Sequence, residues 1–196
     1  NFTFVAHGKA AHSGREFEKG RNAIVAMAKL MATIDQLNST SEITYNVGNF
    51  QGGGALNVVP DLAIGRVNVR IKTVEQQNQV EQQFADLVSL ANQSDGISRE
   101  MHGQFSSPPK PISPGVAELQ LRIKKCAEIL DQPISWRGTG GASDGNKFAA
   151  AGLPNIDTLG PRGGNIHSMD EYLIPESLAP SAKLVTLILL SFANEA

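Results

Sequence analysis

The chain has 196 residues, of which 41% are hydrophobic, and carries a formal net charge of −2 at neutral pH. This length suffices for one full domain or two small ones with a buried core, and the small net charge gives no electrostatic reason to expect nucleic acid or an anionic membrane as a partner. One cysteine, Cys126, excludes an internal disulfide framework and a cysteine-rich metal site. No apolar run comes near the roughly 18 residues of a membrane helix. Because the chain begins at Asn1, inside an expected strand and without an initiator methionine, we expect a fragment of a longer protein.

The first half of the chain predicts strands and helices in alternation. Apolar residues with period two predict four strands, over residues 2–6, 43–47, 63–71 and 97–105. Apolar residues at steps of three and four predict helices over residues 23–37 and 80–91. A glycine-rich breaker, residues 50–57, follows the second strand. The order strand, helix, strand, strand, helix, strand is that of the ferredoxin-like βαββαβ unit, so we expect an α+β domain over residues 1–106 with its helices on one face of the sheet.

A proline-rich connector, SSPPKPISPG, precedes a second region that spans residues 107–196. We expect there a helix to about Leu130 with Cys126 buried on its apolar face, a glycine-rich turn, a short helix and a final apolar helix. Short strands are expected near residues 134–136 and 155–158. Two short strands are too few for a typical sheet of about five or six. This region is therefore expected to be part of a domain that is poorly ordered or depends on a missing segment for burial.

His167 is the first candidate for a functional residue. It follows a run of glycines and precedes Asp170 and Glu171, as in many loop metal sites. A catalytic zinc takes about three protein ligands, yet the sequence offers no His-x-His, His-x-Asp or H-E-x-x-H pair. From the local sequence, a loop histidine bonded to backbone is the more frequent case.

Further candidates lie in turns and on a polar strand face. His12, in a turn-rich segment, could donate a hydrogen bond to a substrate oxygen, or could be a surface histidine with no role. Asn57 and Arg70 could together hold a carboxylate through an amide donor and a guanidinium fork, although spacing alone favours two surface residues. The segment GTGGASDG could expose backbone N–H groups to a phosphate. It lacks the lysine and the glycine spacing of nucleotide-binding loops, and its Ser143-Asp144 pair fits a helix cap equally well.

Three segments taken in order resemble one known family. They read GKAAHSGREFEKGRNAI, NVVPDLAIGRVNVR and GTGGASDGNKFAAAGLPNIDTLGPRGGNIHSMDEYL. They resemble the dimerisation (lid) domain and the carboxyl-terminal half of the catalytic domain in metallopeptidase family twenty, the zinc aminoacylases and carboxypeptidases. This family includes glutamate carboxypeptidase, acetylornithine deacetylase and succinyl-diaminopimelate desuccinylase. The resemblance covers essentially the whole chain.

The resemblance implies a homodimeric hydrolase in which two zinc ions and a glutamate base activate a bridging water to cleave an amide. It implies that His12 crosses the dimer and stabilises the tetrahedral oxyanion in the partner's site. Asn57 and Arg70 would hold the carboxylate of a peptide or N-acyl amino acid substrate. His167 would be the last zinc ligand, which leaves Asp170 and Glu171 as structural residues.

The same resemblance implies that the loop residues Thr139, Gly140 and Gly141 line the substrate pocket with backbone donors. The family's other ligands, an H-x-D segment, a bridging aspartate and a glutamate pair, do not occur in these 196 residues. We therefore expect this chain alone to be inactive and His167 to bind no metal in it.

The sequences of the glycine-rich segments look closest to the glutamate carboxypeptidase branch of this family. This resemblance implies a carboxypeptidase that releases a carboxyl-terminal amino acid such as glutamate. The alternatives are an N-acyl-amino-acid deacylase of the same family and a dimerisation module without catalysis. One cysteine fits the cytoplasm, and a periplasmic location stays open.

Overall fold

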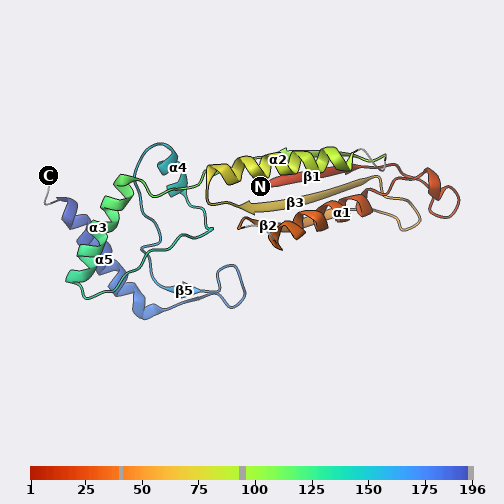
Figure 1. The fold of residues 1–196 in the computed structure, drawn as a ribbon. Coiled ribbons are helices and arrows are strands. Elements are labelled where there is room, and N and C mark those ends of the chain that lie inside the picture. Colours follow the sequence, from red (N-terminus) through yellow and green to blue (C-terminus); the bar gives the residue numbers. More distant parts are fainter. Residues whose placement is uncertain (40–41, 93–95, 194–196) are drawn as a thin grey trace. The chain divides into compact units, whose positions relative to one another are not determined.

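The computed structural model describes residues 1–39, 42–92 and 96–193, which form two compact units, Asn1–Pro109 and Lys110–Ala196 (Figure 1). The first unit contains strands β1 (Phe2–His7), β2 (Thr44–Gly52), β3 (Leu62–Arg70) and β4 (Ser98–Gly103), and helices α1 (Ala23–Gln36) and α2 (Val74–Ala91). Short 3-10 turns, η1 (Phe17–Lys19) and η2 (Leu37–Ser39), flank α1.

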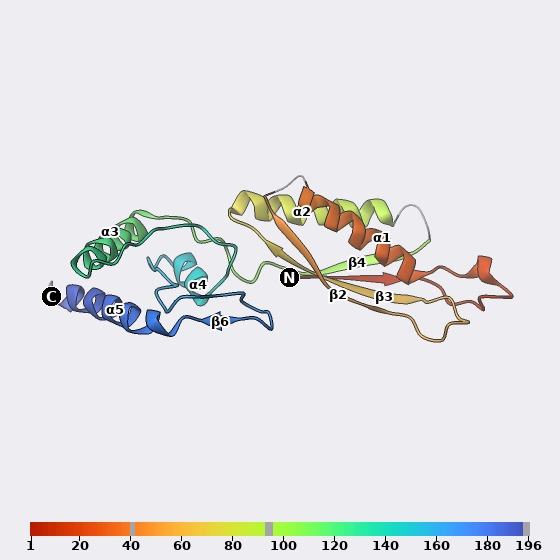
Figure 2. The ribbon, with the colours of Figure 1, turned by 90° about the horizontal axis from the view of Figure 1, so that it is seen from below.

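The four strands form one antiparallel sheet in the order β2-β3-β1-β4. Figure 2 shows α1 and α2 together along one face of this sheet. The predicted α+β, ferredoxin-like βαββαβ arrangement is therefore confirmed. The two ends of the sheet differ: His7 of β1 pairs with Leu62 of β3 at one end, and Thr44 of β2 pairs with Arg70 of β3 at the other.

The core of the first unit lies between the sheet and the two helices. Alternate residues of β1 point into it, and the rings of Phe2 and Phe4 meet Phe84 of α2 edge to face, with centroids 5.1 and 5.2 Å apart. Met27 and Ile34 of α1 are fully buried against the same layer. This packing fixes both helices on the sheet and so fixes where the loops at its ends emerge.

Two element boundaries differ from the sequence expectation. β2 continues to Gly52, through part of the predicted breaker, because β3 offers hydrogen bonds along its whole length and a bulge between Val47 and Asn49 resets the register. α2 begins at Val74, because Thr73 and Gln76 form a capping box. Its first turn contains a single apolar residue, the exposed Val74, so no apolar periodicity marked it.

The second unit contains α3 (Pro114–Ile129), α4 (Asp144–Ala150), the short hairpin β5 (Gly163–Gly164) and β6 (Tyr172–Leu173), the 3-10 turn η3 (Pro175–Ser177) and α5 (Leu178–Ala193). Cys126 is buried where α3 packs on α5, as expected. The strands expected near residues 134–136 and 155–158 are wrong. Both segments lack a ladder of cross-strand hydrogen bonds, and a strand needs a paired neighbour to form.

Much of the apolar surface of the second unit is exposed. On α5, Leu189 is 65% and Leu190 is 53% exposed. By length and composition alone, Pro175–Ala193 could cross a membrane, with a mean hydropathy of 1.3. This helix contains the charged residues Glu176 and Lys183, so it is not the continuous apolar run that was expected to be absent. One face of α5 packs on α3 through Leu184 and Ile188. This face of the helix is therefore in contact with protein.

Candidate functional site

His12 and Asn57 lie side by side at one end of the first sheet. The loop that follows β1 pairs with the loop that precedes β3 through an antiparallel bridge between His12 and Val58. The Ser13 N–H donates to the Asn57 carbonyl at 2.9 Å, and the Val59 N–H donates to the Ala11 carbonyl at 2.8 Å. Both candidate side chains are exposed on this paired loop. The structure thus brings together two residues that are 45 positions apart in the sequence.

A backbone hydrogen bond sets the chemical form of His12. The Gly14 N–H donates to Nδ1 of His12 at 3.1 Å. Since Nδ1 is an acceptor here, the proton of the neutral ring lies on Nε2. That N–H group can donate to a ligand oxygen, as an oxyanion-stabilising side chain must. Sequence reasoning missed Gly14, although its place two residues after a turn histidine is where such a local bond forms.

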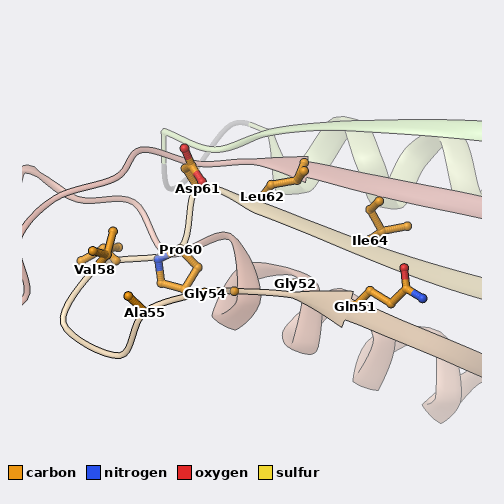
Figure 3. A pocket seen from close by; sticks show the side chains of 11 residues that line it. Gln51, Gly52, Gly54, Ala55, Val58, Pro60, Asp61, Leu62 and Ile64 are labelled. Atoms are coloured by element: carbon orange, nitrogen blue, oxygen red, sulfur yellow. The ribbon is translucent and has the colours of Figure 1, made fainter.

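A shallow pocket lies beside this loop, between the end of β2 and the start of β3 (Figure 3). Its lining is mainly backbone and small apolar side chains, including Gly52, Gly54, Ala55 and Val58. Asp61 is the ionisable residue of the lining. The pocket therefore offers shape and apolar contact next to Asn57, and little chemistry of its own.

Arg70 lies at the opposite end of β3 from this loop. It pairs with Thr44 and is exposed. The eight residue steps from Leu62 to Arg70 span about 26 Å at about 3.3 Å per residue. One chain therefore does not place Asn57 and Arg70 around the same carboxylate, and the simple interpretation of a joint grip within one chain is wrong. The sequence spacing of 13 residues hid this separation, because nine of those residues form one extended strand.

Thr139, Gly140 and Gly141 are exposed in the loop that leads into α4. Ser143 caps this helix: its Oγ accepts from the Gly145 N–H at 3.1 Å, and its own N–H donates to Oδ1 of Asn146 at 3.0 Å. The cap interpretation of Ser143 is therefore confirmed.

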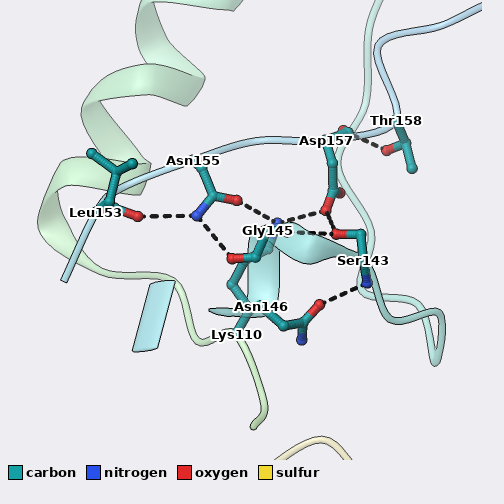
Figure 4. Close-up of polar contacts among 8 residues, drawn as sticks. All are labelled: Lys110, Ser143, Gly145, Asn146, Leu153, Asn155, Asp157 and Thr158. Carbon is teal, nitrogen blue, oxygen red and sulfur yellow. Dashed lines mark hydrogen bonds and ion pairs between the residues drawn. The ribbon is translucent and has the colours of Figure 1, made fainter. Parts of the chain in front are cut away.

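Asp157 joins this loop to the rest of the second unit (Figure 4). It accepts hydrogen bonds from the Ser143 hydroxyl and, at 3.0 Å, from Nζ of Lys110. The Ser143 hydroxyl, and then the Lys110 ammonium, lower the pKa of the Asp157 carboxyl from its usual value. Sequence reasoning missed Asp157 and Lys110, because their contacts span 14 and 47 residues and no local pattern marks them.

His167 lies in the turn between β5 and β6. Its backbone has a positive φ of 68°, which is uncommon for a residue with a side chain. Its N–H donates to the Glu171 carboxylate at 3.0 Å, and the Asp170 N–H donates to Oγ of Ser168 at 3.1 Å. These two acidic residues thus build the turn that presents the exposed imidazole.

The part of the chain that the structure describes contains no group of three or more His, Cys, Asp or Glu side chains that could hold a metal ion. His167 is one donor, whereas a catalytic zinc takes about three protein ligands. The described residues therefore do not fit a complete metal centre by themselves.

Comparison with known proteins places the first unit in a family. Residues 1–95 match the family model of the peptidase dimerisation domain. The uncharacterized protein YqjE of Bacillus subtilis (strain 168) is 30% identical over 182 residues, which cover 93% of this chain and 48% of that protein. A succinyl-diaminopimelate desuccinylase of Nitrosococcus oceani is 29% identical over 168 residues, which cover 84% of this chain and 43% of that protein. The chain spans about half the length of the curated relatives it matches.

Solved structures share the fold. A tripeptidase from Staphylococcus aureus matches with a TM-score of 0.81 at 27% identity, over 95% of this chain and 49% of that chain. A dinuclear metal-binding peptidase of the M20 family from Bacillus subtilis matches with a TM-score of 0.70 at 16% identity, over 95% of this chain and 48% of that chain, a likeness of fold alone. The first unit of this chain therefore belongs to the peptidase dimerisation domains of metallopeptidase family twenty.

Proposed function

We propose that this chain is the dimerisation domain and part of the catalytic domain of a metal-dependent hydrolase of amide or peptide bonds. The observation that carries the proposal is the paired loop at the end of the sheet, where Gly14 holds His12 as an Nε2–H donor beside Asn57. The named relatives, a desuccinylase and a tripeptidase, both act on such bonds, which supports the reaction class.

In this proposal His12 and Asn57 of one copy serve a site in a second copy. His12 donates from Nε2 to the oxyanion that forms when the scissile carbonyl is attacked. The substrate carboxylate lies between Asn57 of one copy and Arg70 of the other, because about 26 Å of strand separates the two residues within one chain. A homodimer is thus a condition of activity, in keeping with the dimerisation domain family.

The proposed contact surface is the outer edge of β2 together with the exposed face of α1. β2 is an outer strand of the sheet with nine residues, so its outer edge can pair with a second copy. Beside it, α1 exposes Val25, Ala28 and Ala32 at helical spacing. These side chains are small or medium-sized, so a second helix can approach closely.

The proposed metal is zinc, with His167 as one donor and the remaining donors supplied from outside the described residues. When bound, such a centre would polarise the scissile carbonyl and activate water. The proposed substrate carries a free carboxylate: a peptide with a carboxyl-terminal residue such as glutamate, or an N-acyl amino acid as the alternative.

The test is hydrolysis by the full-length protein that contains this chain. Substrates would be a dipeptide ending in glutamate, its carboxyl-terminal amide, an N-acetyl amino acid and an N-succinyl amino acid, each with and without added Zn²⁺. We expect metal-dependent cleavage of the free acids and a kcat/KM about 100-fold lower for the amide, because Arg70 and Asn57 then lose their anionic partner. Absence of any hydrolysis would contradict the proposed function, and equal rates on the acid and its amide would contradict the role of Arg70.

A further inference from the structure

The Asp157 carboxylate connects three separate segments of the second unit. It binds Ser143 at the start of α4 and Lys110 from the connector. Lys110 also donates to Oδ1 of Asn155 at 3.2 Å, and Nδ2 of Asn155 donates to the Gly145 carbonyl at 3.0 Å. The connector, the helix start and residues 155–157 are therefore held together by one polar cluster (Figure 4).

The Ser143 hydroxyl both donates and accepts a hydrogen bond in this cluster. Its O–H donates a hydrogen bond to Oδ2 of Asp157, and its oxygen accepts one from the Gly145 N–H at 3.1 Å. Its backbone N–H is held by Asn146. Because Ser143 follows residues 139–142 directly, these bonds fix the point at which the glycine-rich loop ends.

The approach between the helix start and residues 155–157 is close. A Cβ atom on Gly145 would lie 2.5 Å from Oδ1 of Asn155 and 3.0 Å from Oδ2 of Asp157. A contact as short as 2.5 Å does not occur for real side chains, so with any other residue at position 145 the Asn155 side chain would have to shift. The cluster is therefore packed tightly as well as hydrogen-bonded.

We propose that Asp157 is a positioning residue, which through Ser143 holds Thr139, Gly140 and Gly141 where their backbone groups meet the substrate. This role rests on the proposed function and on the family resemblance, which implies that the loop lines the substrate pocket. Asp157 touches no reacting atom; it acts through the loop.

The cluster depends on the charge of Asp157. Its hydrogen bonds to Ser143 and Lys110 lower the pKa of this carboxyl, so the carboxylate persists until the pH falls through that lowered value. Lys110 is the cation that faces it, and on α4 the neighbouring Asp144 is paired with Lys147 at 3.0 Å. Protonation of Asp157 should thus release Ser143 and then the loop, at a pH below the usual titration range of an aspartate.

The experiment is an NMR titration of the 196-residue chain from pH 7 to about pH 2.5. The amides of Gly140 and Gly141 report on the loop, the carboxyl carbon of Asp157 reports its charge, and the buried residues Ile123 and Leu184 report on the packing of α3 and α5. We expect the loop amides and the Asp157 carboxyl to change with one shared midpoint, lower than that of an ordinary aspartate, while Ile123 and Leu184 stay unchanged there.

Variants separate positioning from general stability. Ser143→Ala should raise amide hydrogen exchange of Gly140 and Gly141 about tenfold at pH 7 and abolish the shared midpoint, because the link to Asp157 is gone. Ser143→Thr retains the hydroxyl and should restore both. Exchange that stays within about twofold of the unmodified chain in Ser143→Ala would overturn the proposal. If Ser143→Ala also exposes Ile123 and Leu184, Asp157→Ala decides, because it removes the same hydrogen bond from the other side. The same loop response in Asp157→Ala supports the role, and no response overturns it.

These readouts need no catalysis, so they separate this role from the proposed function. A full-length protein that hydrolyses no amide would contradict the function and leave the NMR result standing. In an active protein, Ser143→Ala should raise KM about tenfold and leave kcat within about twofold, because the loop binds substrate without taking part in the chemistry. A loss confined to kcat would overturn the positioning role.

Discussion

His12 shows how a backbone contact can prepare a side chain for chemistry. The residue type alone allows either ring nitrogen to carry the proton, and only the Gly14 N–H on Nδ1 selects Nε2 as the donor. The sequence marked His12, Asn57 and His167 as candidates through motif resemblance. It did not mark Gly14 or Asp157, because hydrogen bonds across a turn or between distant segments leave no periodic pattern. Chemistry-bearing side chains were thus easier to predict than the groups that orient them.

Gly145 gives a prediction at the scale of one residue. Gly145→Ala should destabilise the second unit by about 1–3 kcal/mol, because the new methyl group overlaps Oδ1 of Asn155 and displaces that side chain from its bonds to Lys110 and to the Gly145 carbonyl. Gly138→Ala is the matched control: nothing lies within 4 Å of its Cβ position, so its effect should stay within about 0.5 kcal/mol. Urea unfolding followed by circular dichroism measures both. Equal stability of the two variants would show that the close contact at Gly145 is not maintained.

The elements of the first unit were predictable because each has its own apolar period and its partner in the same chain. Residues 2–6 alternate cleanly, and β3 and β4 lie on either side to pair with them. The second unit fails this test: residues 134–136 and 155–158 have the composition of strands but no neighbouring strand to bond with. An extended segment becomes a strand only when it pairs with a neighbouring strand. Periodicity alone therefore predicts more strands than form.

The face of α1 beside β2 carries the prediction at the element scale. In the proposed dimer, Ala32→Arg should yield a monomer, because a long charged side chain there would keep the two copies of α1 apart. Gln79→Arg is the control, since it adds the same charge to an exposed position of α2. Light scattering after size exclusion gives the mass of each variant. A dimer that persists in Ala32→Arg, or a monomer in both variants, would move the contact surface elsewhere.

At the scale of the whole molecule, the length of β3 limits which residues of one chain can contact the same substrate group. Its nine residues place Arg70 far from the loop that holds His12 and Asn57. A substrate carboxylate is only a few ångströms across, so Asn57 and Arg70 of one chain cannot both bind it. If all these residues serve one substrate, as the family resemblance implies, then two chains must contribute. This conclusion follows from strand geometry together with the dimerisation domain fold, and spacing in the sequence did not reveal it.

Complementation between two inactive variants tests this shared site most directly. His12→Ala and Arg70→Ala would each be made in the full-length protein, and each variant alone should be nearly inactive. His12→Ala should lower kcat, and Arg70→Ala should raise KM. After mixing and subunit exchange, about half of the dimers are mixed, and each mixed dimer has one site with an intact His12 and an intact Arg70. We expect activity to return to about a quarter of that of the unmodified protein. No recovery, with exchange verified by mass, would contradict a site built from two copies.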